Sequence, residues 1–302
     1  MRQPAPGRFV DVGGRALHFN ASGQGKPVVV LEAGIAASSI SWSLVQERVA
    51  RFTTVLSYDR AGFGWSEAAR DHDGTARTAA RDLRALLDHS GQTGPYILVG
   101  HSFGGLIARV FEQDYPESVA GLILVDPVVR AEWRNLPDAR RRMLNHGVTL
   151  SRRGALLARL GIVGLALRLL TGGSQRIPKL LARVSAGKGA SVTDRLVGEV
   201  RKMPREHWPA IAEHWSQARS FEAMARNLDK LPASVGQVDE QRGLGDLPVT
   251  ILSAGKPVPE HEADALLSTR GESIAVPNSG HWIQLDDPDA VVDAIWRMVR
   301  SL

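Results

Sequence analysis

The first 127 residues alternate between short apolar runs and longer segments in which apolar residues recur every three or four positions. Runs rich in Val, Ile and Leu and bounded by Gly, Pro or Asp are typical of buried strands, and the longer segments are typical of amphipathic helices. Gly13-Gly14 would close a two-residue hairpin turn between the first two strands. The alternation favours a mostly parallel sheet with helices on both faces. The pattern predicts strands at residues 8–12, 15–20, 27–32, 53–58, 97–100 and 119–126 and helices at 41–52, 75–90 and 106–115.

From about residue 128 to residue 246 the strand-like runs disappear. We therefore expect one α/β core made of residues 1–127 and 247–302, into which residues 128–246 are inserted as a helical lid. The spacing within the insertion predicts helices at residues 131–145, 154–170, 193–202 and 206–227. In the final part of the chain it predicts strands at 248–254 and 273–276 and helices at 260–268 and 288–299.

The composition is that of an ordinary globular enzyme, with 43% hydrophobic and 23% charged residues among 302. The absence of cysteine excludes disulfides, thiolate metal ligands and a cysteine nucleophile. No apolar segment follows the N-terminal residues as it would in a secretory signal. The most apolar window, residues 154–170, contains two arginines and falls short of a membrane span. These features predict a cytoplasmic protein without stable membrane insertion.

The formal net charge is +5, and the arginines are spread along the chain. We interpret this charge as a dispersed basic surface that keeps the protein in solution, with an anionic substrate or a membrane face as the alternatives. No basic run carries interleaved aromatic residues, so nucleic acid is not an expected partner. Nothing in the pattern indicates an oligomeric state.

One motif, Gly100-His101-Ser102-Phe103-Gly104, joins a predicted strand to a predicted helix. In Gly-x-Ser-x-Gly a sharp turn forces the central residue into strained φ/ψ space and presents its side chain at the carboxyl end of a sheet. The flanking glycines are needed because a Cβ at either position would strike the neighbouring strand or helix. We predict that Ser102 is a nucleophile and that His101, which points away from it, has a packing role.

A serine hydroxyl needs a base to take its proton, and that base should be a histidine held by a carboxylate. His281 is the strongest candidate because it lies in the loop after the last predicted strand, at the same sheet edge as Ser102. Two carboxylates compete to orient it. Asp126 ends the strand that follows the nucleophile helix, and Glu260 follows the next-to-last strand. We prefer Asp126 and keep Glu260 as the alternative.

The tetrahedral intermediate of acyl transfer carries an oxyanion, at which two backbone N–H groups should point. Phe103 offers one of them at the N-terminus of the nucleophile helix. Ile35 offers the other from the loop after the strand at residues 27–32. Only backbone groups are involved, so apolar side chains are compatible with both positions.

Taken together and in this order, the motifs resemble those of the α/β-hydrolase superfamily, in its lidded serine-esterase-like branch. Gly100–Gly104 is similar to the nucleophile elbow, Ala33-Gly34-Ile35 to the usual His-Gly-x segment, residues 59–66 to the Asp-x-x-Gly-x-Gly-x-Ser loop, and Gly280-His281 to the histidine loop. The resemblance covers about residues 8–127 and 247–300. It implies an α/β-hydrolase fold, with a mostly parallel eight-stranded sheet and an inserted helical lid, and no cofactor.

Two positions depart from that family pattern. Ala33 stands where histidine is usual, which leaves the geometry of the oxyanion loop open. Val258 falls where the family commonly places its triad aspartate. The second departure again favours Asp126, because the resemblance extends to haloalkane dehalogenases, which can take their acid from this earlier strand.

The resemblance implies a serine hydrolase that cleaves carboxylic esters of small to medium apolar acyl groups through an acyl-enzyme. Dehalogenases and epoxide hydrolases of the superfamily use an aspartate nucleophile, and Ser102 argues against both. Three alternatives stay open on the same fold: hydrolysis of a carbon–carbon bond, cofactor-free perhydrolysis, and non-catalytic binding of a small ligand.

The predicted lid contains the sequence Glu-His-Trp twice, seven residues apart, ending at Trp208 and Trp215. The two histidines would lie about two helical turns, ~10 Å, apart, so we do not expect a metal site. The tryptophans either pack the lid onto the core or line a pocket for the acyl group of a small-molecule ester.

Overall fold

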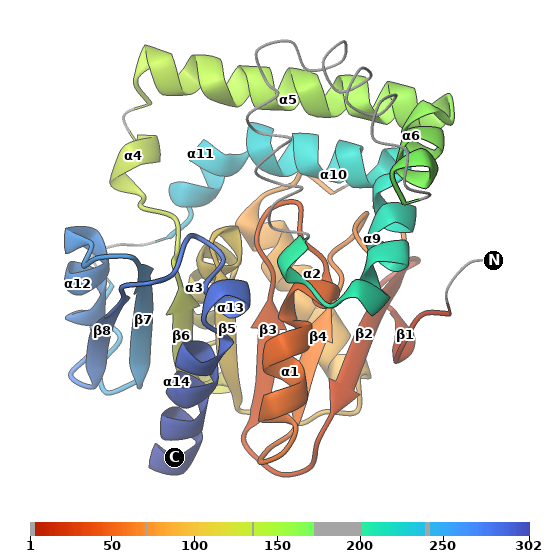
Figure 1. Ribbon diagram of the computed structural model, residues 1–302. Coiled ribbons are helices and arrows are strands. Elements are labelled where there is room, and N and C mark those ends of the chain that lie inside the picture. Colours follow the sequence, from red (N-terminus) through yellow and green to blue (C-terminus); the bar gives the residue numbers. More distant parts are fainter. Residues whose placement is uncertain (1–3, 70–71, 135, 172–200, 239–241) are drawn as a thin grey trace.

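The computed structural model describes residues 4–69, 72–134, 136–171, 201–238 and 242–302. Its strands form one eight-stranded sheet in the order β1-β2-β4-β3-β5-β6-β7-β8, as Figure 1 shows. Strand β2 is antiparallel to both of its neighbours, and all pairs from β4 to β8 are parallel. The mostly parallel sheet expected from the sequence is confirmed.

The first two strands form the predicted hairpin. The Val12 N–H donates to the Arg15 carbonyl at 2.9 Å, and the two glycines between them have φ of 93° and 87°. Glycine adopts two successive positive φ values without strain, which is what a tight hairpin turn needs. The strands are β1 (Arg8–Asp11), β2 (Ala16–Ser22), β3 (Val28–Glu32), β4 (Val55–Tyr58), β5 (Tyr96–His101), β6 (Val119–Val125), β7 (Val249–Ala254) and β8 (Gly271–Val276).

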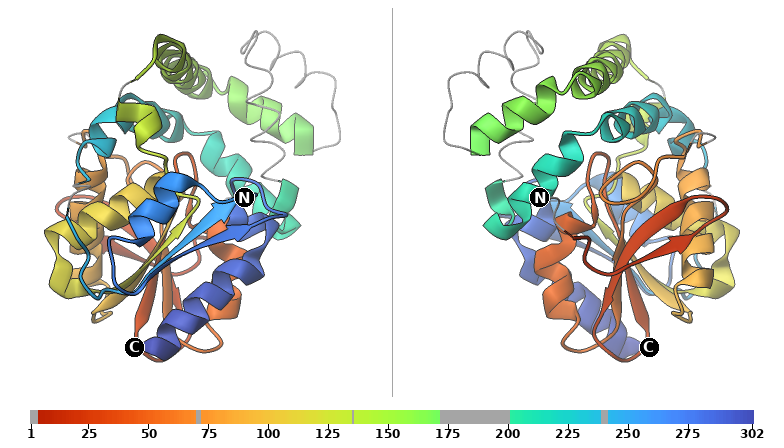
Figure 2. Two further views of the ribbon diagram at one scale, coloured as in Figure 1. Left: turned by 90° about the vertical axis from the view of Figure 1, so that its left-hand side faces the viewer. Right: turned by 90° about the vertical axis from the view of Figure 1, so that its right-hand side faces the viewer.

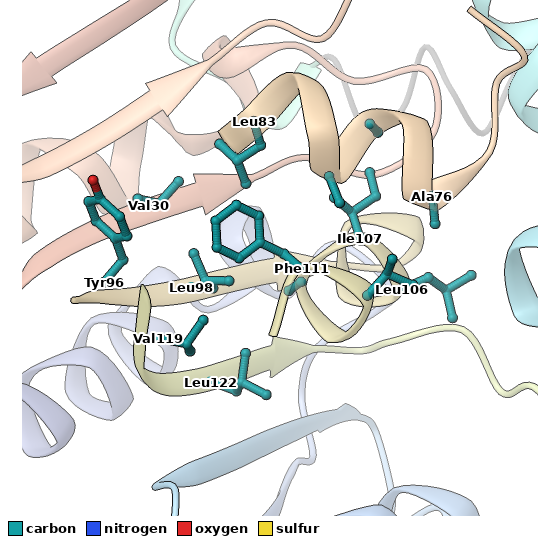
Figure 3. Packing of buried hydrophobic residues seen from close by; sticks show 14 of the residues in the cluster. Val30, Ala76, Leu83, Tyr96, Leu98, Leu106, Ile107, Phe111, Val119 and Leu122 are labelled. Carbon is teal, nitrogen blue, oxygen red and sulfur yellow. The ribbon is translucent and has the colours of Figure 1, made fainter. Parts of the chain in front are cut away.

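Helices cover both faces of the sheet because the side chains of its central strands alternate between two apolar clusters. Val30 and Leu98 pack toward α2 and α3, whereas Val29 and Ile97 pack toward α1 and α14. Figure 3 shows the first of these clusters, in which Leu83, Ile107 and Phe111 meet Leu98. The core elements are η1 (Ser39–Trp42), α1 (Ser43–Val49), α2 (Ala76–His89), α3 (Phe103–Asp114), η2 (Pro116–Ser118), α12 (Pro259–Ala265), α13 (Ile283–Asp286) and α14 (Pro288–Ser301).

Every helix or strand that the structure describes between β6 and β7 is a helix, as expected for the insertion. Helices α5 and α10 lie across one end of the sheet, as Figures 1 and 2 show. Arg219 of α10 donates to the carbonyls of Gly64, at 2.8 Å, and Ser66, in the loop that follows β4. The insertion contains α4 (Ala131–Arg134), α5 (Asp138–Arg159), α6 (Ile162–Thr171), η4 (Arg205–His207), α9 (Trp208–Trp215), α10 (Ala218–Asp229) and α11 (Leu231–Val235).

Several of the predicted helix boundaries in the insertion are wrong. Helix α5 runs unbroken through the gap that we expected between helices at 131–145 and 154–170. The breaks fall instead after Arg134 and at Leu160-Gly161, where Gly161 has φ 74°. A Cβ on Gly154 would lie 2.5 Å from the Phe221 ring, so glycine at this position lets α10 pack closely against α5. The helix expected at 206–227 divides at Gln217, whose backbone is extended. Most of the helix expected at 193–202 lies outside the described residues.

No helix in the described part of the chain is long and apolar enough to cross a bilayer.

Candidate active site

Ser102 stands on a strained turn between β5 and α3, with φ 54° and ψ −117°. Its N–H donates to the Val125 carbonyl at 3.0 Å, which ties the turn to the end of β6. A Cβ on Gly100 would lie 2.4 Å from the Gly104 carbonyl oxygen, and a Cβ on Gly104 would lie 2.5 Å from that of Glu32. Real Cβ atoms do not approach backbone that closely, so both glycines are required for this turn.

Asp126 and His281 are 155 positions apart in the sequence and meet at the carboxyl edge of the sheet. The Nδ1–H of His281 donates to Oδ2 of Asp126 at 2.6 Å. The other carboxylate oxygen accepts the Ala254 N–H at 3.0 Å, which orients the Asp126 side chain from β7. In a neutral imidazole with its proton on Nδ1, Nε2 has the lone pair that a general base needs.

The carboxyl group of Asp126 stays ionised. Burial raises its pKa, but the hydrogen bonds from His281 and Ala254 outweigh burial and hold the pKa below its usual range. A permanently charged carboxylate is what stabilises an imidazolium when the histidine takes up a proton.

The structure brings Ser102 and His281 to the same edge, but among the described residues no hydrogen bond joins the serine hydroxyl to the imidazole. The side chain of His281 is half exposed, at 50%. In unliganded enzymes such catalytic contacts are often long and tighten only when substrate binds. The arrangement is compatible with proton transfer from serine to histidine in the presence of substrate.

His101 does more than the packing expected of it. Its Nε2–H donates to the His281 carbonyl at 2.9 Å, and its ring lies 4.7 Å from the His281 ring and 5.1 Å from that of Trp282. Burial, with a further contribution from His281, lowers the pKa of His101 to about 3, so this imidazole is neutral. A Cβ on Gly34 would lie 2.9 Å from Nδ1 of His101. His101 therefore connects the elbow, the histidine loop and the Gly34 loop.

Glu260, the alternative acid, binds backbone at the start of the insertion. Its carboxylate accepts the Arg130 N–H at 2.5 Å and the Ala131 N–H at 2.9 Å. The Arg130 guanidinium in turn pairs with both carboxylate oxygens of Asp264 at 2.6 Å. Glu260 and Asp264, both on α12, thus fasten the first residues of the insertion to the core, and it is Asp126 that contacts the histidine.

The two backbone groups predicted to bind an oxyanion lie in suitable segments. Phe103 is the first residue of α3, where N–H groups have no partner within the helix. Ile35 lies in a tight turn in which the Ala37 N–H approaches the Gly34 carbonyl at 3.4 Å and Ala36 has φ 65°. The described residues offer the Ile35 N–H no hydrogen-bond acceptor.

The model of the alpha/beta hydrolase fold family matches residues 27–288. The chain belongs to this family. The mouse protein named sn-1-specific diacylglycerol lipase ABHD11 is 25% identical over 277 residues, covering 89% of this chain and 80% of the mouse protein. The uncharacterized protein YbdG of Bacillus subtilis is 33% identical over 122 residues, covering 40% of this chain and 37% of YbdG, little more than a third of its length.

Solved structures agree with the family assignment at the level of fold. The structure titled epoxide hydrolase CorEH without ligand has a TM-score of 0.72 and 22% identity, covering 97% of this chain and 98% of the other. The α/β-hydrolase fold with a helical insertion, implied by the sequence motifs, is confirmed.

The two tryptophans of the insertion, Trp208 and Trp215, have different surroundings in this member of the alpha/beta hydrolase family. Nε1 of Trp208 donates to the Met203 carbonyl at 3.1 Å, within the insertion. Trp215 packs on an apolar cluster that includes Ile211, and Trp282, the neighbour of His281, packs on the same cluster. Trp215 and Trp282 thus pack against one cluster, to which both the insertion and the core contribute. The predicted contact of Trp208 and Trp215 with substrate stays a prediction.

Two buried polar side chains near the site, His261 and Arg60, were not predicted from the sequence. Buried His261 bonds the Pro127 carbonyl at 3.1 Å through Nε2 and the Ser253 hydroxyl at 2.7 Å through Nδ1, beside Asp126. Buried Arg60 reaches the backbone of the loop after β3. Neither residue stands in a local pattern that reveals its partner. Within the described ranges, no group of three or more His, Asp or Glu side chains could hold a metal ion.

Proposed function

We propose that this alpha/beta hydrolase cleaves carboxylic esters of small to medium apolar acyl groups through an acyl-enzyme on Ser102. The observation that carries the proposal is the 2.6 Å hydrogen bond between Asp126 and His281, at the sheet edge where the strained elbow presents Ser102. A serine, a histidine and a partly buried carboxylate that orients it form the set of groups that acyl transfer requires.

In the first half of the reaction, the Ser102 hydroxyl oxygen attacks the ester carbonyl carbon while Nε2 of His281 accepts its proton. The charge of Asp126 stabilises the resulting imidazolium. His281 then gives the proton to the leaving alkoxide oxygen as the bond from the acyl carbon to that oxygen breaks. In the second half, water attacks the acyl-enzyme with the same histidine as base, which releases the acid and regenerates Ser102.

The negative charge that develops on the carbonyl oxygen would be stabilised by the N–H groups of Phe103 and Ile35. The Phe103 group lies at the positive end of the α3 dipole, which adds to its effect. Both donors are fixed before substrate binds, so no reorganisation is needed as the charge forms.

The substrate class is supported by two observations. The mouse relative is named a diacylglycerol lipase, and it aligns over most of both chains. Partly buried Trp215 of the insertion and Trp282 beside His281 pack against one apolar cluster that joins the insertion to the core. An apolar acyl group would be favoured against such side chains, with the insertion acting as the lid.

The test is pre-steady-state kinetics with a chromogenic acyl ester. We expect a burst of alcohol equal to the enzyme concentration, covalent labelling by an alkyl phosphonate, and loss of both in Ser102→Ala. A burst retained in Ser102→Ala would contradict the proposal. Two further substrates distinguish the alternative reactions of the same triad. Turnover of a diketone would indicate hydrolysis of a carbon–carbon bond, and turnover of a carboxylic acid with peroxide would indicate perhydrolysis. Tight binding of these compounds without turnover would indicate a receptor.

A further inference from the structure

Arg60 belongs to the glycine-rich loop at residues 59–66, to which the proposed acyl transfer assigns no role. Its side chain is buried, 6% exposed, and reaches the segment that follows β3. Nη1 donates to Oε1 of Glu32 at 2.5 Å and to the Ala33 carbonyl, and Nη2 donates to the Gly34 carbonyl at 2.6 Å. We infer that Arg60 is the positioning residue of the oxyanion loop, an inference that rests on the proposed function.

The geometry of a single peptide connects Arg60 to the oxyanion. The Gly34 carbonyl and the Ile35 N–H belong to the same planar trans unit and point in opposite directions. A donor that holds the carbonyl on one side therefore aims the N–H on the other side. The donor is a charged guanidinium, which makes shorter and stronger hydrogen bonds than a neutral group. It also polarises the peptide, which strengthens the N–H as a donor.

The loop needs an external restraint because it is strained. Ala36 has φ 65°, a conformation that side chains other than glycine rarely adopt. The turn's own hydrogen bond, from the Ala37 N–H to the Gly34 carbonyl, is long at 3.4 Å. A strained residue persists only where its surroundings determine the backbone from several sides. Position 33 carries only a methyl group, so a side chain from another loop has to supply the restraint.

Two neighbours fix the guanidinium itself. The carboxylate of Glu32 pairs with Arg60 and also accepts a hydrogen bond from the buried Tyr58 hydroxyl. The guanidinium lies 5.8 Å from the ring of Phe103, whose N–H is the second proposed oxyanion donor. Arg60 and Glu32 together carry no net charge. Their contribution is therefore the orientation of the loop rather than long-range attraction of an anion.

The decisive variant is Arg60→Lys, which keeps the charge opposite Glu32 but cannot span two carbonyls and a carboxylate as a planar fork does. We expect kcat for an acyl ester to fall roughly ten- to a hundred-fold, with KM changed by no more than about twofold. The corresponding thionoester provides the specific readout. Sulfur is a weak hydrogen-bond acceptor, so the variant should lower the ester rate more than the thionoester rate.

The matched control is Arg130→Lys, which alters another buried arginine paired with a carboxylate, at the start of the insertion. It should lower thermal stability while keeping the wild-type ratio of ester to thionoester rates. Amide hydrogen exchange gives a readout that does not depend on turnover: Arg60→Lys should speed exchange in residues 33–37, and Arg130→Lys should not.

An unchanged rate ratio together with unchanged exchange in Arg60→Lys would overturn the inference, even if the variant melts at a lower temperature. Equal losses of ester and thionoester turnover would overturn it too, because they indicate general damage to the site. If the wild-type protein forms no acyl-enzyme, the proposed function fails, and the exchange experiment still decides whether Arg60 holds the loop.

Discussion

Asp126 and Glu260 show how hydrogen bonding separates two carboxylates that the sequence places at the same sheet edge. Asp126 accepts one bond from His281 and one from the Ala254 N–H. Glu260 uses both of its oxygens on the backbone at the start of the insertion. A carboxylate can orient a histidine only if one of its oxygens faces the ring, so the residue that holds Nδ1 is Asp126.

We expect Asp126→Asn to lower kcat by roughly three to four orders of magnitude, because an amide favours the wrong tautomer of His281. Glu260→Gln should keep kcat within a few-fold and act mainly on stability, because it weakens the bonds that fasten α4. Steady-state kinetics and thermal unfolding of the two variants side by side check this. A collapse of kcat in Glu260→Gln alone would reverse the assignment.

At the scale of elements, helices α3 and α5 contain glycines for opposite reasons. A Cβ on Gly104 in α3 would lie 2.5 Å from the Glu32 carbonyl oxygen and 2.8 Å from that of Ala33. A Cβ on Gly147 in α5 would meet only a methyl group of Leu228, at 3.4 Å. The first glycine lets the nucleophile helix approach β3 closely, whereas the second only weakens its helix.

Gly104→Ala should therefore lower both the melting temperature and kcat, because α3 must move away from the oxyanion loop. Gly147→Ala should raise the free energy of unfolding by about 0.5–1 kcal/mol, the usual gain of alanine over glycine in a helix. Urea unfolding and ester turnover of both variants test the contrast. Equal effects of the two substitutions would show that backbone approach does not distinguish the sites.

At the scale of the whole molecule, buried titratable groups make stability depend on pH. Burial lowers the pKa of His101 to about 3 and that of His214 to about 4. Burial also lowers the pKa of His72 to about 4 and raises that of Asp82 to about 6. As the pH falls, a histidine with a lowered pKa binds a proton in the unfolded protein before it does so in the folded protein. Such a histidine therefore lowers the free energy of unfolding in acid. The raised pKa of the Asp82 carboxyl has the opposite effect and adds stability as the pH falls.

The opposite pKa shifts of His72 and Asp82, whose Nε2 and Oδ2 atoms lie 3.5 Å apart, therefore offset one another. Of these four groups, His101 and His214 determine the net effect. Between about pH 6 and pH 4 unfolding should take up roughly two protons, a loss of about 2.7 kcal/mol per pH unit of acidification. Urea unfolding at several pH values measures the slope. Among the described atoms neither ring nitrogen of His214 has a hydrogen-bond partner. His214→Phe should thus remove about one proton from the slope, and a flat profile in the wild type would contradict the prediction.

Local sequence was sufficient to predict most of the sheet and to nominate the groups that we propose to react. The strands are short apolar runs that can be buried on both faces, and glycines two residues before and after a serine are typical of a strand-to-helix turn that presents it. His281 could be placed beside Ser102 because the carboxyl ends of parallel strands share one edge. Sequence spacing alone determined these features, since each depends on local conformation and strand direction.

The tertiary structure decided what depends on contacts between distant segments. In the fold, Asp126 and not Glu260 is hydrogen-bonded to His281. Gly154 lies inside an unbroken α5 and lets the Phe221 ring of α10 pack closely against it. Arg60 donates hydrogen bonds to the carbonyls of the loop that follows β3. No local sequence pattern predicts such contacts, because a hydrogen bond or a close approach between distant segments depends on the whole fold. The sequence therefore determined which groups could react, and the packing of distant segments determined how they are held.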